Sequence, residues 1–163
     1  MILPLVVLDV RAQVAADPSF AADDGAVRVH EAQHGPIPER AFVALLTGWG
    51  VRWPDVAATD NRDARGVSQA PGWDVSALQL LFEQRGTVAI GHDVASTDPA
   101  SLAEAGEVPA ETYVLGYGRW QIELMANLDR IPARGALVIA TWPKPKGGSG
   151  FRARCFAILP RDD

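Results

Sequence analysis

Short runs of hydrophobic residues alternate along this chain with polar stretches punctuated by glycine and proline. Apolar runs of about four to eight residues are typical of buried strands. Such runs predict strands over residues 6–10, 42–46, 87–90, 136–141 and 153–159. The first run reaches back almost to Met1, whereas most domains lead in with a frayed polar segment. We therefore expect the domain to be incomplete at its N-terminus.

One segment has the periodicity of a helix that packs on a core. Its apolar stripe consists of Val75, Leu78, Leu81 and Phe82. Asp74 precedes the stripe as a helix-capping residue, and Gly86 follows it as a stop signal. Pro99 and Pro109 each predict the first turn of a further helix, the second of which extends to Gly116.

The stretch from Trp120 to Asp129 combines both periodicities. Its alternating apolar residues are Trp120, Ile122, Leu124, Ala126 and Leu128. Trp120, Leu124 and Leu128 also fit a helical stripe. We favour a strand, because glycine punctuates its entry and proline its exit. Either element would project Glu123 from a rigid, half-buried position; the alternative is an ordinary exposed glutamate.

The order of these elements indicates the fold class. Strands that alternate with short helices, followed by two adjacent strands, predict an α/β domain with a mixed sheet. The 163 residues suffice for one core, so we expect a single domain over residues 1–163. Residues 50–73 show no clear period and are expected to be irregular.

Charge, N-terminal sequence and cysteine content limit the kinds of partner and the cellular compartment that we expect. Fifteen basic against 20 acidic residues give a formal net charge of −5, which argues against a nucleic-acid partner. The apolar start ends at Asp9, too soon for a membrane span, and it lacks the basic region of a signal peptide. Cys155 is the single cysteine, which excludes an internal disulfide and fits a reducing cytoplasm.

Two histidines have the spacing of a metal-binding helix. His30 and His34 lie in HEAQH, which has the His-Glu-x-x-His form found in zinc proteases. Residues 27–33 predict one or two helical turns, but Gly35 and Pro36 end any helix directly after His34. Without a continuous helix, a chance match is the favoured interpretation.

Several blocks along nearly the whole chain carry a resemblance to a known family. They are VVLDV, EAQHGPIPERAFVALLTGW, PGWD, AIGHDVASTD, the segment from Glu123 to Asp129, and GGSGFRARCFAIL. In this order they resemble the metal-dependent hydrolases of the cyclase family, which includes bacterial kynurenine formamidases and isatin hydrolases. The resemblance implies a swivelling β/β/α fold, a dimer or tetramer, and hydrolysis of an amide or cyclic C–N bond by metal-activated water.

The resemblance also implies metal ligands, and most of them are absent from this sequence. The family's run His-x-Gly-Thr-His-x-Asp-x-Pro-x-x-His, which binds zinc or manganese, does not occur here. Its later pair is a His followed twelve residues on by a Glu; Glu123 matches the Glu, and Glu111 stands in place of the His. A carboxylate also binds these metals, so Glu111 is the second candidate ligand. The alternative for Glu111 is a surface residue in the first turns of a helix.

The missing ligands leave three explanations open. A hydrolytic metal site needs about three protein ligands and an open position, so two carboxylates do not hold a metal tightly. The chain is the C-terminal part of a longer hydrolase, a degenerate member that has lost its chemistry, or a subunit whose partner supplies ligands. We favour the first, because Met1 falls at the edge of a predicted strand.

The block AIGHDVASTD resembles a family segment that lies near the substrate pocket. By this resemblance Asp93, Ser96 and Asp98 are candidates for substrate binding. The alternative is a local role, in which these side chains satisfy backbone N–H groups of loops. The tryptophans near predicted loop ends are Trp49, Trp53 and Trp73. They are candidates for an aromatic-substrate pocket, although core or interface packing is the simpler expectation.

We therefore expect a cytoplasmic, metal-dependent hydrolase of the kynurenine formamidase type that uses zinc or manganese. The expected substrate is a small amide or lactam, and the expected assembly is a homodimer or homotetramer without nucleic-acid or membrane partners. The alternative is a non-catalytic family member that serves as a binding or assembly subunit.

Overall fold

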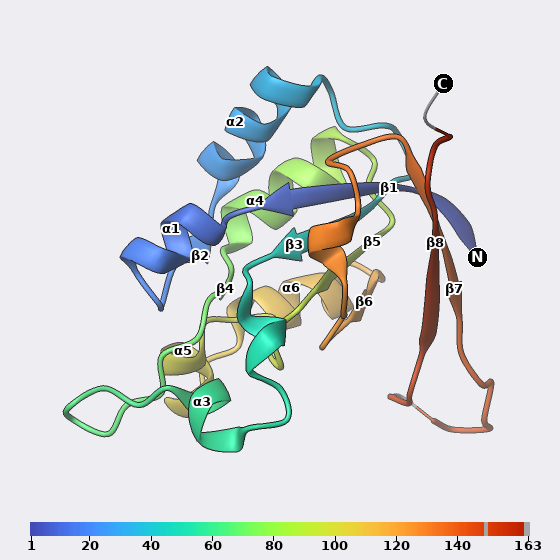
Figure 1. The fold of residues 1–163 in the computed structure, drawn as a ribbon. Coiled ribbons are helices and arrows are strands. Elements are labelled where there is room, and N and C mark those ends of the chain that lie inside the picture. Colours follow the sequence, from blue (N-terminus) through green and yellow to red (C-terminus); the bar gives the residue numbers. More distant parts are fainter. Residues whose placement is uncertain (149, 162–163) are drawn as a thin grey trace.

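The fold is described by a computed structural model over residues 1–148 and 150–161. A six-stranded sheet with the order β6-β5-β3-β1-β7-β8 forms its centre (Figure 1). The strands are β1 (Ile2–Asp9), β3 (Phe42–Leu46), β5 (Ala89–His92), β6 (Trp120–Ile122), β7 (Ala136–Thr141) and β8 (Arg154–Ile158). Strands β6, β5, β3 and β1 are parallel, whereas β7 is antiparallel to both of its neighbours. The predicted mixed α/β sheet is confirmed.

Short helices connect the strands. They are α1 (Arg11–Ala16), α2 (Asp24–His34), α3 (Val56–Asp60), α4 (Val75–Gln79), α5 (Ala100–Glu104) and α6 (Pro109–Gly116), with the 3-10 turns η1 (Trp49–Arg52) and η3 (Leu128–Arg130) and the π-helical turn η2 (Leu80–Gln84). Strands β2 (Ala21–Ala22) and β4 (Gly72–Trp73) form a separate small parallel ladder. Among the described residues, no helix combines the length and apolar character needed to cross a lipid bilayer.

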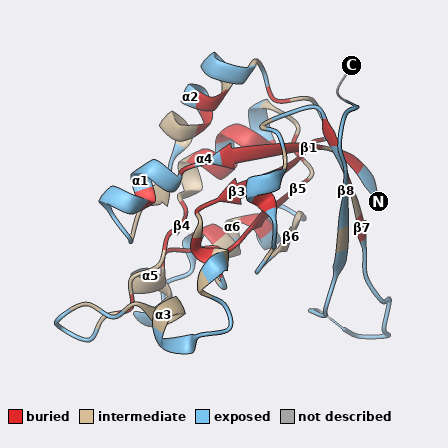
Figure 2. Ribbon diagram, viewed as in Figure 1, coloured by how far each residue is buried: buried red, intermediate tan, exposed pale blue. Residues whose placement is uncertain are grey.

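Two apolar layers enclose the parallel part of the sheet. On one face, Leu78 of α4 and Val114 of α6 form a hydrophobic core together with the side chains that β1, β3 and β5 direct to this side. On the other face Phe42 and Leu128 belong to a second core, which is closed by η3 and the segment before β7. Figure 2 shows burial concentrated on β1, β3 and β5, whereas the β7–β8 hairpin is largely exposed.

The helix predicted after Asp74 is present, and its capping is as expected. The Asp74 carboxylate accepts a hydrogen bond from the Ser76 backbone N–H at 2.8 Å. Residues 50–73, which we expected to be irregular, contain η1 and α3 instead. No residue of α3 is buried, so this helix has no apolar stripe to reveal it. It is held by a cap, in which Asp55 accepts from the Ala58 N–H at 3.1 Å.

The strand predicted over residues 120–128 ends earlier, at Ile122, so this prediction is wrong for the remaining residues. Leu124 and Asn127 have positive φ angles of 52° and 61°, which a continuing strand does not allow. The chain turns back here, and the backbone N–H groups of Leu124 and Met125 donate to the carbonyls of Val94 and His92 at 3.0 and 2.9 Å.

His92, at the end of β5, should make stability sensitive to mild acid. It is fully buried, and neither ring nitrogen has a hydrogen-bond partner among the described residues. Burial lowers the pKa of His92 to about 3. The unfolded chain therefore binds this proton more tightly, and stability falls as pH drops from about 6.5 toward the folded pKa. Between about pH 7.5 and pH 5 we expect a loss of about 2 kcal/mol from His92 alone.

Urea unfolding at these two pH values, in wild type and in His92→Leu, checks this expectation. The variant replaces the titrating ring with an apolar side chain of similar volume. Its loss of stability between these two pH values should therefore be about 2 kcal/mol smaller than that of the wild type. His30, whose pKa burial lowers to about 4, contributes in the same direction and is unchanged in the variant. Equal pH dependence in both proteins would refute the role of His92.

Candidate functional site

Because β1, β3, β5 and β6 are parallel, their carboxyl ends lie along one edge of the sheet. Ligand sites of α/β proteins gather at such an edge. The segments that follow these strands carry Arg11, Thr47, Asp93 and Glu123. Two of the five candidate residues from the sequence therefore lie directly after parallel strands.

Asp93 anchors the loop that follows β3. Its buried carboxylate accepts hydrogen bonds from the Thr47 N–H at 3.0 Å, the Thr47 hydroxyl at 2.5 Å, the Gly48 N–H at 2.9 Å and the Gly50 N–H at 3.4 Å. These four donors occupy most of the acceptor capacity of a carboxylate. Asp93 thus has the local role that we gave as an alternative, and its part in substrate binding stays a prediction.

A cavity of about 530 Å³ opens beside this loop. Its lining includes Arg11, Gly48, Gly50, Asp93, Met125 and Asn127. The cavity is therefore formed at the carboxyl ends of β1, β3 and β5, with the turn after β6 as its far wall.

Arg11 is a residue of this cavity that sequence reasoning missed. Its guanidinium donates to both carboxylate oxygens of Asp9, with Nη2 at 2.7 Å from Oδ2. Hydrogen bonding to Arg11 lowers the pKa of Asp9. The signal in the sequence was an Asp and an Arg two residues apart, directly after a buried strand.

A second, more apolar cavity of about 260 Å³ is the location of Ser96. Trp49 and Trp53 line it as well; Trp53 is exposed, whereas Trp49, like Trp73, is buried in the core. Trp49 is fixed by its indole N–H, which donates to the Thr59 carbonyl at 2.9 Å. The prediction of an aromatic pocket is thus consistent with the positions of Trp49 and Trp53, and core packing accounts for Trp73.

Asp98 is not a lining residue of either cavity. It is 1% exposed, and its carboxylate accepts from the backbone N–H groups of Ala110 at 2.7 Å and Glu111 at 3.0 Å. These are first-turn donors of α6, which have no partner within the helix. Asp98 therefore caps α6 although it lies outside that helix in the sequence. Its role in the structure is this cap, and it contacts neither cavity.

The two candidate metal ligands come from different elements. Glu111 is in the first turn of α6, and Glu123 follows β6. Burial of the carboxylate and the negative charge of Glu111 raise the pKa of Glu123, although the residue as a whole is exposed and not half-buried as predicted. The Gln121 amide donates to Glu123 at 3.3 Å. The structure thus places Glu111 close enough for its negative charge to affect the titration of Glu123.

These two carboxylates do not by themselves fit a hydrolytic metal. Across residues 1–148 and 150–161, no group of three or more His, Cys, Asp and Glu side chains gathers closely enough to hold an ion. Cys155 is half-buried on β8, where burial raises the pKa of its thiol, so it is neither a ligand nor an activated nucleophile.

Comparisons with known proteins agree with the fold. Residues 1–99 match the family described as "Putative cyclase". An isatin hydrolase from Roseibium aggregatum is 32% identical over 163 residues, which cover 99% of this chain and 61% of that protein.

Solved structures of isatin hydrolases are similar over nearly the whole chain. Isatin hydrolase A from Labrenzia aggregata, bound to benzyl benzoate, has a TM-score of 0.87 at 32% identity, with 97% of this chain and 61% of that chain covered. Isatin hydrolase A from Ralstonia solanacearum has a TM-score of 0.88 at 32% identity, with coverage of 98% and 60%. The chain thus spans about 61% of the length of the relatives that it matches. The resemblance seen in the sequence is confirmed, and this chain belongs to the cyclase family.

Proposed function

We propose that this chain is part of a hydrolase that cleaves an amide or cyclic C–N bond. The observation that carries the proposal is the match to isatin hydrolases over nearly all of the chain, in sequence and in fold. The cavity of about 530 Å³ at the carboxyl edge of the parallel strands supports it, because its volume lies within the range of about 300–1,000 Å³ typical of small-molecule sites.

Zinc or manganese is the proposed cofactor, with Glu123 as first ligand and Glu111 as second. Burial first, and the negative charge of Glu111 second, raise the pKa of Glu123, and a bound divalent cation would offset both effects. The remaining ligands must come from residues outside the described part of this chain, since no third ligand lies nearby within it. We also propose a homodimer or homotetramer in the cytoplasm.

The proposed substrate is a flat aromatic molecule with a lactam or N-formyl group. Trp49 and Trp53 line the apolar cavity, and the exposed indole of Trp53 suits an aromatic ring. A lactam corresponds to an isatin hydrolase and an N-formyl aryl amide to a kynurenine formamidase. Both compounds are therefore assayed in parallel.

A complementation experiment tests the function. The 163-residue chain is compared with a fusion to the part of an isatin hydrolase that the chain does not cover, called the complemented protein below. We expect negligible hydrolysis by the chain alone, and metal-dependent hydrolysis of isatin or an N-formyl aryl amide by the complemented protein.

Two outcomes would contradict the proposal. Enzyme-like turnover by the chain alone would show that the ligands need not come from elsewhere. A folded complemented protein that hydrolyses neither compound and binds no metal would favour the non-catalytic binding or assembly subunit.

A further inference from the structure

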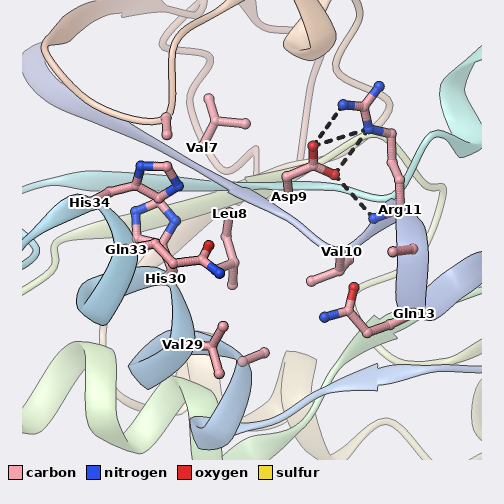
Figure 3. Close-up of a pocket in the computed structure, with 13 residues that line it drawn as sticks. Val7, Leu8, Asp9, Val10, Arg11, Gln13, Val29, His30, Gln33 and His34 are labelled. Atoms are coloured by element: carbon pink, nitrogen blue, oxygen red, sulfur yellow. Dashed lines mark hydrogen bonds and ion pairs between the residues drawn. The ribbon is translucent and has the colours of Figure 1, made fainter.

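A cavity of about 640 Å³ lies between helix α2 and the segment from β1 to α1 (Figure 3). Its lining includes Leu8, Gln13, Val29, His30, Gln33 and His34. None of the residues proposed above as metal ligands or substrate contacts lines it. The cavity is thus separate from the proposed hydrolytic site, although Arg11 borders both cavities.

Two imidazole rings share one wall of this cavity. His30 and His34 are one turn apart on α2, so their side chains lie on the same face of the helix. Their ring centres are 4.8 Å apart, with the ring planes at 46°. Two rings that bind one ion through nitrogens about 2.1 Å away have centres on the order of 5 Å apart. Figure 3 shows the two rings next to each other on this wall of the cavity.

The helix that the sequence left in doubt continues far enough to place both rings. Helix α2 runs through His34, and Gly35 ends it with a φ of 88°. The ring of His30 is 5% exposed, and burial together with the neighbouring His34 lowers the pKa of His30 to about 4. Each imidazole ring has two nitrogens, and the neutral ring binds a metal through either one.

Glu31 shows that this motif is not a zinc-protease site. Its carboxylate accepts from Nε and Nη2 of Arg85 at 2.7 and 2.9 Å, and from the Ile37 N–H at 3.2 Å. A carboxylate engaged in this way is not free to act as a general base. The ion pair instead ties α2 to the segment after η2 and fixes the backbone that carries the two histidines.

We propose that His30 and His34 form a site for one divalent transition-metal ion, which keeps exchangeable water ligands toward the cavity. With two imidazole ligands, and no third His, Cys, Asp or Glu of the described residues placed to complete a three-ligand group, it is a weak site compared with a structural zinc site. Imidazole ligands favour copper and nickel over manganese. Arg134, which donates to the His34 carbonyl, adds a positive charge that opposes the ion.

Calorimetric titration with Ni²⁺ tests this site without any assay of hydrolysis. The untagged, chelator-treated 163-residue protein carries Glu123→Gln, so that binding at the proposed hydrolytic site does not contribute. We expect saturable binding of one equivalent. Loss of an outer-shell partner already costs about 10–100-fold in metal affinity, so His34→Ala should weaken binding by at least about tenfold. Arg134→Gln should tighten it.

Gln13→Ala is the matched control, because Gln13 lines the same cavity from α1 and is not a typical metal ligand. It should bind Ni²⁺ like the parent. His34 is exposed, so its replacement should leave the metal-free melting temperature unchanged. The site is refuted if the parent shows no saturable binding below about 1 mM Ni²⁺, or if His34→Ala binds like the parent.

Discussion

Glutamine at position 123 is expected to lower kcat/KM of the complemented protein at least about 100-fold, because it removes the negative charge of a proposed metal ligand. The amide keeps the size of the side chain, and Glu123 contributes no buried packing. The fold should therefore be unchanged. Loss of metal from the purified variant should accompany the loss of activity.

Glu107→Gln is the matched control for this variant. Glu107 is an exposed glutamate in the loop before α6, and its replacement removes the same charge without touching Glu123. It should retain activity and metal content. If Glu123→Gln hydrolyses the substrate at the rate of the parent complemented protein, Glu123 is not a metal ligand. The proposed hydrolase function would stand in that case.

Asp93→Ala should destabilise the chain by about 3–5 kcal/mol, because several buried or partly buried donors lose a shared acceptor. The variant leaves three backbone N–H groups and the Thr47 hydroxyl without their acceptor. Each unsatisfied buried donor costs about 1–3 kcal/mol, and water from the adjacent cavity reduces the sum. Urea unfolding at neutral pH measures the loss.

Asp129→Ala is the comparison for this measurement. Asp129 borders the same cavity but is exposed, so its removal should change the free energy of unfolding by less than about 0.5 kcal/mol. Hydrogen exchange adds a local test, since the amides of Thr47 and Gly48 should exchange faster in Asp93→Ala. A variant as stable as wild type would show that the loop does not depend on this carboxylate.

Local signals accounted for much of the fold. Pro109 marked the start of α6, the run from Phe42 to Leu46 is β3, and Asp74 caps α4, all as predicted. These elements can be predicted because the residues that specify them, namely a capping side chain, an apolar run or a proline, lie within or next to the element. The short helix α3 was missed because it lacks a buried face.

The roles of the site residues depend on contacts that no local pattern contains. Asp93 meets Thr47 across 46 positions, and Glu31 meets Arg85 across 54. The end of β6 likewise depends on the pairing of Leu124 with Val94 in the neighbouring segment. Sequence reasoning found these residues but not their partners, so it could not separate loop-fixing carboxylates from carboxylates available to a ligand.

The central place of β1 in the sheet has a consequence for the order in which the chain acquires its shape during synthesis. On one side β1 pairs with β3, which leaves the ribosome soon afterwards, whereas its other side waits for β7, with Leu5 opposite Ala136. At about 5–20 residues per second, that flank of β1 stays unpaired for several seconds after its own emergence. Until β7 emerges, that flank of β1 presents unpaired backbone N–H and C=O groups, and chaperone contact is most valuable in that interval.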